Sequence, residues 1–318
     1  MLEKISEAIE ACRTFLIVSH ERPDGDALGS ELAIYHLLKA LGKEAVVYSQ
    51  DVTPDHYRFL PGSDRIVSEW PAVAFDAAIV VDCSELDRVG QEAKRIGAIP
   101  TLINIDHHVS NGGFCEAALI DPSASSTGEL VCRLIAHERW PIGPETATCL
   151  YTAILTDTGG FRYGSTSAAT LRAAADLVAH GASPQFISEH VYESHAPAKI
   201  RLMAAVLPTL TLEEGGRVGS LTVTLQAIAE AGALSEHTEG FVDLPRTIRG
   251  VEISILFVEL AAGRFKLSFR SKGNVNVERV ARALGGGGHV NAAACRMEGA
   301  LADVRRRVLE QIRISGWA

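Results

Sequence analysis

Residues 14–30 read TFLIVSHERPDGDALGS, and this stretch decides the fold class of the protein. Its first six residues are largely apolar and β-branched, which predicts a buried strand. A loop with Pro23 and Gly25 follows, and apolar residues then recur over 28–41 at the spacing of an amphipathic helix. A buried strand that leads directly into a helix is the repeating unit of a parallel sheet covered by helices.

The same alternation continues through the first 160 residues. Further strands are expected at 45–49, 77–81 (AAIVV) and 101–105 (TLINI), and helices near 126–139, 145–156 and 167–181. The order of expected elements then changes. Strands are expected at 219–225, 251–260 and 265–270, followed by a helix at 276–284, a glycine cluster and a last helix at 301–314. The pattern predicts an α/β fold, a mainly parallel sheet flanked by helices, with a second, smaller α+β domain. We expect a first domain at 1–187, a connecting helix at 188–205 and a second domain at 206–318.

Composition and cysteine usage are those of an ordinary globular protein. The chain has 318 residues, of which 47% are hydrophobic and 22% charged, and this disfavours a disordered or collagen-like protein. Its apolar runs are too short to span a membrane, and its first residues lack the pattern of an export signal. The six cysteines are scattered without a C-x-x-C pair, so we expect a cytoplasmic protein without disulfide bonds.

Charge is distributed unevenly along the chain. The net charge is −9, and residues 1–198 carry 14 basic and 27 acidic residues, whereas residues 199–318 carry 16 and 12. An acidic region is therefore joined to a basic one. The overall negative charge argues against a protein that binds long duplex nucleic acid through bulk electrostatics.

Acidic and histidine residues follow each strong strand of the first region. In a parallel sheet the carboxyl ends of the strands share one edge, where ligands bind. Carboxylate oxygens with imidazole nitrogens suit divalent ions such as Mn²⁺, and a shared carboxylate such as that of Asp82 can bridge two ions. The candidate metal ligands are His20, Asp24, Asp26, Asp82, His107 and Asp157.

Each candidate also has an ordinary structural interpretation when it is taken alone. Asp26 is placed to cap the following helix, and Asp82 to cap a turn. His20 can be a packed residue, and the pair at 107–108 can lie on the surface. Together they favour a metal site, because so many acids at one edge repel one another unless cations neutralise them. Phe161 and Tyr163 beside Arg162 offer either a base-stacking surface or ordinary packing.

With these residues identified, the chain resembles the DHH phosphoesterase family, named for the triplet Asp106-His107-His108. Four segments carry the resemblance in the first region: SHERPDGDALGS at 19–30, VVDCSELDRVG at 80–90, NIDHHVSN at 104–111 and LTDTGGFRY at 155–163. RSKG at 270–273 and GGGGHVNAAA at 285–294 resemble the DHH-associated substrate-binding domain. The resemblance covers essentially the whole chain.

The resemblance implies a role for each matching residue. One Mn²⁺ would be held by His20, Asp24 and Asp82, and a second by Asp26, Asp82, His107 and Asp157. His108 would contact the substrate phosphate, and Asp106 would orient a neighbouring side chain. The substrate-binding residues implied for the second domain are Arg270, Gly287, Gly288 and His289.

The two-domain organisation resembles the group of bifunctional oligoribonucleases and adenosine 3′,5′-bisphosphate (pAp) phosphatases. We therefore expect a Mn²⁺-dependent phosphoesterase, an exonuclease of very short RNA that also removes the 3′-phosphate of pAp. Alternatives are a phosphodiesterase of linear or cyclic signalling dinucleotides, a family II inorganic pyrophosphatase and a non-catalytic RNA-binding regulator. The expected partners are short RNA or phosphorylated nucleotides, with no membrane and no long duplex, and a homodimer is compatible with the sequence.

Overall fold

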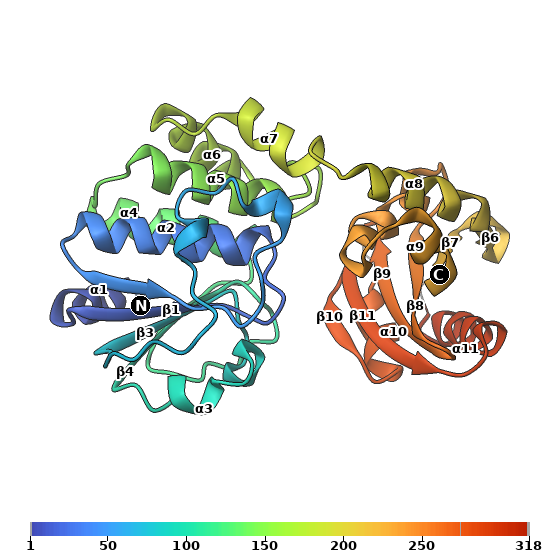
Figure 1. The fold of residues 1–318 in the computed structure, drawn as a ribbon, viewed down its shortest axis with the longest axis horizontal. Helices are drawn as coiled ribbons and strands as arrows, with labels where there is room; N and C mark the ends of the chain where they lie inside the picture. Colours follow the sequence, from blue (N-terminus) through green and yellow to red (C-terminus); the bar gives the residue numbers. More distant parts are fainter. Residues whose placement is uncertain (1, 274, 317–318) are drawn as a thin grey trace. The chain divides into compact units, whose positions relative to one another are not determined.

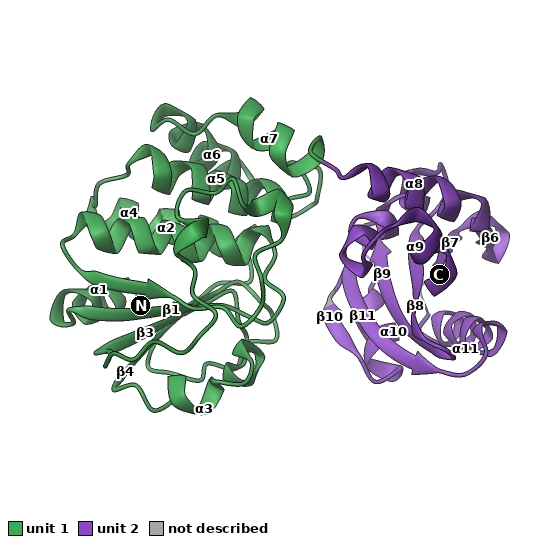
Figure 2. Ribbon diagram, viewed as in Figure 1, with its two compact units in different colours: residues 1–194 green, residues 195–318 purple. Residues whose placement is uncertain are grey.

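The computed structural model describes residues 2–273 and 275–316, apart from the side chain of His289. The chain divides into two compact units, residues 1–194 and residues 195–318 (Figure 2). The division falls within the predicted connecting segment 188–205. Each unit has its own sheet and its own hydrophobic core.

Unit 1 is built on a parallel sheet with helices on both faces, which confirms the predicted fold class (Figure 1). The strand order is β2-β1-β3-β4-β5, and every neighbouring pair is parallel. Alternate residues of β1 point to opposite faces: Phe15 and Ile17 join one core cluster, whereas Leu16 and Val18 join another. The strands are β1 (Thr14–Val18), β2 (Glu44–Val47), β3 (Ala77–Val81), β4 (Thr101–Asp106) and β5 (Ala117–Ile120).

Most of the helices of unit 1 lie on one face of this sheet, and α3 covers the other (Figure 1). The helix α2 packs most extensively against α5, and both carry candidate site residues near their ends. The helices are α1 (Leu2–Ala11), α2 (Gly25–Ala40), α3 (Ala93–Ile96), α4 (Thr127–Glu138), α5 (Pro144–Asp157), α6 (Ala168–Ala179) and α7 (Pro184–Tyr192).

Unit 2 contains a mixed sheet in the order β10-β11-β9-β8-β7-β6. Only the β7–β8 pair is parallel among the pairs described in it. The strands are β6 (Thr211–Glu213), β7 (Val218–Val223), β8 (Ile253–Ala261), β9 (Arg264–Ser271), β10 (Gly287–His289) and β11 (Ala292–Glu298). The helices are α8 (Pro197–Val206), α9 (Leu225–Ala231), α10 (Val277–Ala283) and α11 (Leu301–Ile314).

Two faces of this second sheet are covered differently. The helices α10 and α11 contribute to a core with inward residues of β8, β9 and β11, such as Phe257, Leu267 and Ala293. On the opposite face, α8 and α9 pack over β7 and β8. The other face of β9 is only half-buried, and it carries Arg270.

The structure differs from the sequence-based prediction at the junction of the units. The prediction of a single connecting helix over 188–205 is wrong, because α7 ends at Tyr192 and α8 begins at Pro197. Proline has no backbone N–H, and it forces the residue before it out of the helical region. Ala196 accordingly has a ψ of 141°. The prediction also missed α1, α3, α9, β5, β6 and the β10–β11 hairpin. All of these except α1 have seven residues or fewer, whereas α1 has ten residues and buries Ile5 and Ile9 on one face.

Among the described residues, none of the helices combines the length and apolar character that a membrane span requires.

Candidate metal centre

Three adjacent strands of the parallel sheet end at the candidate centre. His20 follows β1, Asp82 follows β3 directly, and His107 and His108 follow β4. Because β1, β3 and β4 are neighbours and parallel, their carboxyl ends meet at one edge. Asp24 and Asp26 come from the start of α2, and Asp157 is the last residue of α5.

The first group consists of His20, Asp24 and Asp82, each of which offers a ligand atom within 4.8 Å of the others. His20 Nε2 lies 3.4 Å from Asp82 Oδ2, and its Nδ1 lies 2.8 Å from the carbonyl oxygen of Glu21. That second contact orients the ring so that Nε2 faces the carboxylate.

Asp24 also caps α2, a role that the sequence analysis considered for Asp26. Its Oδ1 accepts hydrogen bonds from the backbone N–H groups of Asp26 and Ala27, both at 3.1 Å. The cap fixes the Asp24 carboxylate at the start of the helix. It also leaves Asp26 free of a capping role, with its side chain buried on the side of the metal centre.

The second group consists of Asp26, His107 and Asp157, again within 4.8 Å of one another. His107 Nε2 lies 3.5 Å from Asp157 Oδ2 and 3.8 Å from Asp26 Oδ2. His107 Nδ1 lies 3.4 Å from the carbonyl oxygen of Ala124. All six ligands predicted from the sequence therefore fall into two neighbouring groups.

Asp82 lies between the two groups. Its Oδ2 faces His20, whereas its Oδ1 lies 3.7 Å from His107 Nε2 and 3.6 Å from His108 Nδ1. The Asp82 side chain is buried. Its backbone has a φ of 54°, in the left-handed region that residues other than glycine adopt only occasionally. Such strain is characteristic of functional sites, where the surrounding structure holds a residue in place.

The amino terminus of α4 binds two of these carboxylates, a contribution that the sequence analysis missed. The N–H groups of Thr127 and Gly128 donate to the two oxygens of Asp26 at 2.7 and 2.9 Å. The Thr127 hydroxyl donates to Asp82 Oδ1 at 3.0 Å. Ser126, three residues before Glu129, marks the helix start in the sequence, and a helix start favours anions. That signal locates the helix start in the sequence but not the carboxylates that the helix start reaches.

His108 forms a third group of possible metal ligands with Asp82 and His107, and it also pairs with Asp106. His108 Nδ1 lies 2.6 Å from Asp106 Oδ1, and the Asn111 amide donates to Asp106 Oδ2 at 2.7 Å. Burial opposes ionisation, but the hydrogen bonds from His108 and Asn111 lower the pKa of Asp106. Asp106 is thus a buried carboxylate that orients His108.

The protein alone does not neutralise the negative charge of the carboxylates in the centre. Burial, together with the charges of Asp82 and Asp157, raises the pKa of Asp26 well above its ordinary value. Burial likewise raises the pKa of Asp157 to about 7, although His107 opposes the shift. Burial disfavours protonated imidazole, but the hydrogen bond and charge of Asp82 and the charge of Asp24 raise the pKa of His20 to about 9. The raised pKa values of the carboxyl groups and of His20 both result from several carboxylates lying close together in a largely buried site.

This donor set fits divalent cations that bind oxygen and imidazole nitrogen. The two groups contain carboxylates and histidines and no cysteine among the described residues. Harder ions such as Mn²⁺ prefer such ligands, whereas thiolate-rich sites select zinc. A cation would also relieve the repulsion that raises the pKa of Asp26 and Asp157.

Each unit matches the model of a known protein family. The model of the DHH family N-terminal domain matches residues 14–154, and that of the DHHA1 domain matches residues 220–313. The chain is 36% identical over 317 residues to the bifunctional oligoribonuclease and PAP phosphatase NrnA of Thermus thermophilus, covering 98% of this chain and 93% of the relative. The chain belongs to the DHH phosphoesterase family.

Two other known proteins are similar to this one over nearly the whole chain. A solved structure, an exopolyphosphatase-related protein from Bacteroides fragilis, has a TM-score of 0.91 at 29% identity, covering 98% of this chain and 95% of that one. The cyclic-di-AMP phosphodiesterase GdpP of Geobacillus thermodenitrificans is 29% identical and covers 92% of this chain, but only 46% of that relative is matched.

The residues predicted to bind substrate lie in the DHHA1 part of this family member. Arg270 of β9 is opposite Ala292 of β11, which is opposite His289 of β10. Gly288 has a φ of 143°, and a Cβ there would lie 2.4 Å from the Ala292 carbonyl oxygen, so the hairpin requires glycine. The backbones of Arg270, Gly287, Gly288 and His289 are thus brought to one end of the sheet, while the His289 side chain lies outside what the structure describes.

Proposed function

We propose that this DHH family member hydrolyses very short oligoribonucleotides as an exonuclease and removes the 3′-phosphate of adenosine 3′,5′-bisphosphate. The reaction depends on two divalent metal ions, with Mn²⁺ as the preferred metal. The relative from Thermus thermophilus, which carries both activities in its name, supports this choice of substrates. The completeness of the centre supports an enzyme over a non-catalytic RNA-binding regulator.

The position of Asp82 carries the proposal. Its two oxygens face two different groups of ligands, which is the arrangement of a carboxylate that bridges two ions. His20, Asp24 and Asp82 would hold one ion, and Asp26, Asp82, His107 and Asp157 would hold the other. When bound, such ions lower the pKa of a coordinated water and neutralise charge on a phosphate.

The remaining roles belong to the side chains around these ligands. Asp106 holds a proton at His108 Nδ1, which leaves the Nε2 edge of the ring to contact a phosphate oxygen. Thr127 and Gly128 keep Asp26 and Asp82 in position through three hydrogen bonds. Little movement of these ligands is then needed during the reaction.

Unit 2 provides the substrate-binding residues in this proposal, with 206–318 as the substrate-binding domain. Arg270 can bind a phosphate through two parallel N–H groups, and the backbone of Gly287 and Gly288 allows close approach of an anion. The net charge of +4 over residues 199–318 supports a short anionic substrate.

The experiment that tests the proposal measures hydrolysis by the purified protein with Mn²⁺ across a panel of substrates. The panel contains a diribonucleotide, a longer RNA, adenosine 3′,5′-bisphosphate, a cyclic dinucleotide and pyrophosphate, each repeated with excess EDTA. We expect the highest kcat/KM with the diribonucleotide and adenosine 3′,5′-bisphosphate, and no turnover in EDTA. Undiminished turnover in EDTA, or a clear preference for pyrophosphate or long RNA, would contradict the proposal.

A second candidate is hydrolysis of linear or cyclic signalling dinucleotides. The 29% identity to a cyclic-di-AMP phosphodiesterase over 92% of this chain favours it. A cyclic dinucleotide has no free end, so an exonuclease that needs one will process it slowly. A kcat/KM for the cyclic dinucleotide above that for the linear one would make this the main function.

A further inference from the structure

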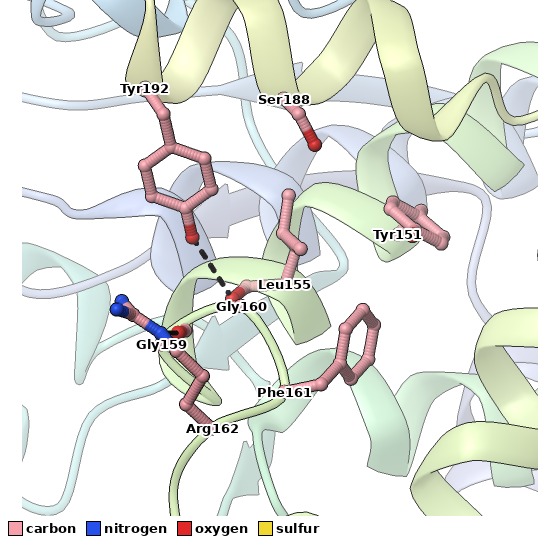
Figure 3. A pocket seen from close by; sticks show the side chains of 8 residues that line it. All are labelled: Tyr151, Leu155, Gly159, Gly160, Phe161, Arg162, Ser188 and Tyr192. Carbon is pink, nitrogen blue, oxygen red and sulfur yellow. Dashed lines mark hydrogen bonds between the residues drawn. The ribbon is translucent and has the colours of Figure 1, made fainter.

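Unit 1 contains a cavity that the proposed metal centre does not use. It has a volume of about 480 Å³, within the range of sites that bind small molecules. Figure 3 shows Tyr192 and Arg162 on one side of it and Tyr151 and Phe161 on the other. The lining residues are Tyr151, Leu155, Gly159, Gly160, Phe161, Arg162, Ser188 and Tyr192.

Phe161 is held at this cavity in an unfavourable backbone conformation. Its φ is 62°, following φ values of 58° at Gly159 and 72° at Gly160. A left-handed backbone costs a residue with a Cβ about 1–2 kcal/mol, and glycine would avoid that cost. The ring instead contacts Tyr151 edge to face, with the centroids 6.0 Å apart. The ring also packs against the hydrophobic core of unit 1, so this conformation places it between the core and the cavity.

The cavity also presents polar groups beside its aromatic walls. Arg162 Nε donates to the carbonyl oxygen of Gly159 at 2.5 Å, which fixes the guanidinium. Among the described residues, its two terminal nitrogens make no other hydrogen bond, and the residue is exposed. The Tyr192 hydroxyl donates to the Leu155 carbonyl oxygen at 3.5 Å, and the Ser188 hydroxyl points into the cavity (Figure 3).

The cavity lies beside the end of α5, the helix whose last residue is a candidate metal ligand. Asp157 is the last residue of α5, and Gly159 is only two residues further along the chain. Their Cα atoms are therefore at most about 8 Å apart. Asp157, a candidate metal ligand, lies in the sequence between two residues that line the cavity, Leu155 and Gly159.

We propose that this cavity binds a base of the nucleotide substrate, with Phe161 and Tyr192 as its aromatic walls and Arg162 placed for an adjoining phosphate. This inference rests on the proposed function and names a part of the substrate that the metal centre does not contact. Stacking on aromatic rings accepts every base, because each base has a π-face. The cavity therefore favours nucleotides over base-free phosphoesters without selecting one base.

The test compares a diribonucleotide with an abasic dinucleotide of the same charge, using wild type, Tyr192→Leu and Phe161→Leu. Tyr192 is 40% exposed, so its replacement leaves the fold intact, which a thermal melt verifies. Phe186→Leu serves as the matched control, because Phe186 is an exposed aromatic on the same helix that does not line the cavity. Stacking is worth about 1–3 kcal/mol per base, so each cavity variant should raise KM for the diribonucleotide about 10-fold. KM for the abasic substrate should not change, and Phe186→Leu should match wild type.

A binding measurement separates this inference from the proposed function. A dinucleotide that contains 2-aminopurine is mixed with each protein in EDTA, where no turnover occurs, and its fluorescence is recorded. We expect stronger quenching with wild type and Phe186→Leu than with Tyr192→Leu or Phe161→Leu. Equal quenching with all four proteins would overturn the base-binding role, whatever the activity. Quenching that depends on the cavity, without hydrolysis by wild type, would keep this site and overturn the proposed function.

Discussion

The two units both place charged residues on a sheet, but they do so in different ways. In unit 1 the charged residues follow the strands of a parallel sheet, so that Asp82 and His107 converge from loops at one edge. In unit 2 Arg270 lies within β9, and its neighbours are set by the antiparallel register with β8 and β11. Loop positions can be crowded and strained, whereas a strand position follows the regular spacing of the sheet.

The difference is visible in the energetics of the two regions. Asp82 is buried with a φ of 54° among other carboxylates, whereas Arg270 is half-buried on an otherwise regular strand. We therefore expect a bound cation to stabilise the centre in unit 1, and we expect no such requirement for Arg270 in unit 2. Variants in the two regions should have different consequences for metal binding and for substrate binding.

The largest effect is expected from Asp82→Ala, which removes the carboxylate shared by both groups. Loss of metal-assisted catalysis is worth several kcal/mol, so hydrolysis of the diribonucleotide should fall by roughly 10³-fold or more. Steady-state assays with Mn²⁺ measure this, and Asp64→Ala, on an exposed aspartate, is the control. Turnover of Asp82→Ala within 10-fold of the control would refute the bridging role.

A smaller effect is expected from Thr127→Val, which removes a hydrogen bond to Asp82 but no ligand. Partners of metal ligands typically contribute about 10–100-fold to metal affinity. Titration of Mn²⁺ into metal-free protein should show this weakening. Thr166→Val is a matched control, because the Thr166 hydroxyl has no hydrogen-bond partner among the described residues. Equal affinities for both variants would show that the Thr127 hydroxyl does not position Asp82.

Arg270→Ala tests whether unit 2 contributes to substrate binding without contributing to metal binding. Loss of a charged hydrogen bond to phosphate costs about 1.5–3 kcal/mol, so KM for the diribonucleotide should rise at least about 10-fold. Mn²⁺ titration should be unchanged, because Arg270 is not part of either ligand group. Arg264→Ala, six residues away on the same face of β9, is the control. Loss of Mn²⁺ binding in Arg270→Ala would contradict the separation of roles.

The smallest effect is expected on stability, from Glu129→Gln in α4. Glu129 accepts hydrogen bonds from Ser125, Thr170 and Arg133, which outweigh burial and lower its pKa. A lowered pKa stabilises the fold above the unfolded value of about 4.3, and this contribution is lost as pH falls through the folded value.

Urea unfolding of wild type and Glu129→Gln at several pH values tests this. The variant should be about 1–2 kcal/mol less stable at pH 7, and the difference should shrink below about pH 4. A difference that stays constant from pH 7 to pH 3 would show that the ionised carboxylate contributes nothing.

The sequence alone predicted most of the centre but little of its surroundings. His20, Asp82 and His107 could be found because they follow apolar strands, and parallel strands end together. The hydrogen bonds from Thr127 and Gly128 could not, because they depend on where a distant helix begins in space. The same holds for Tyr192, which reaches the cavity beside Phe161 only through the packing of α7.

The most direct test of the account is to locate Mn²⁺ by anomalous scattering in crystals of the protein grown with the metal. We predict two ions about 3.5–4 Å apart, with the Asp82 carboxylate bound to both. A single ion, or two ions that do not share Asp82, would contradict the central claim.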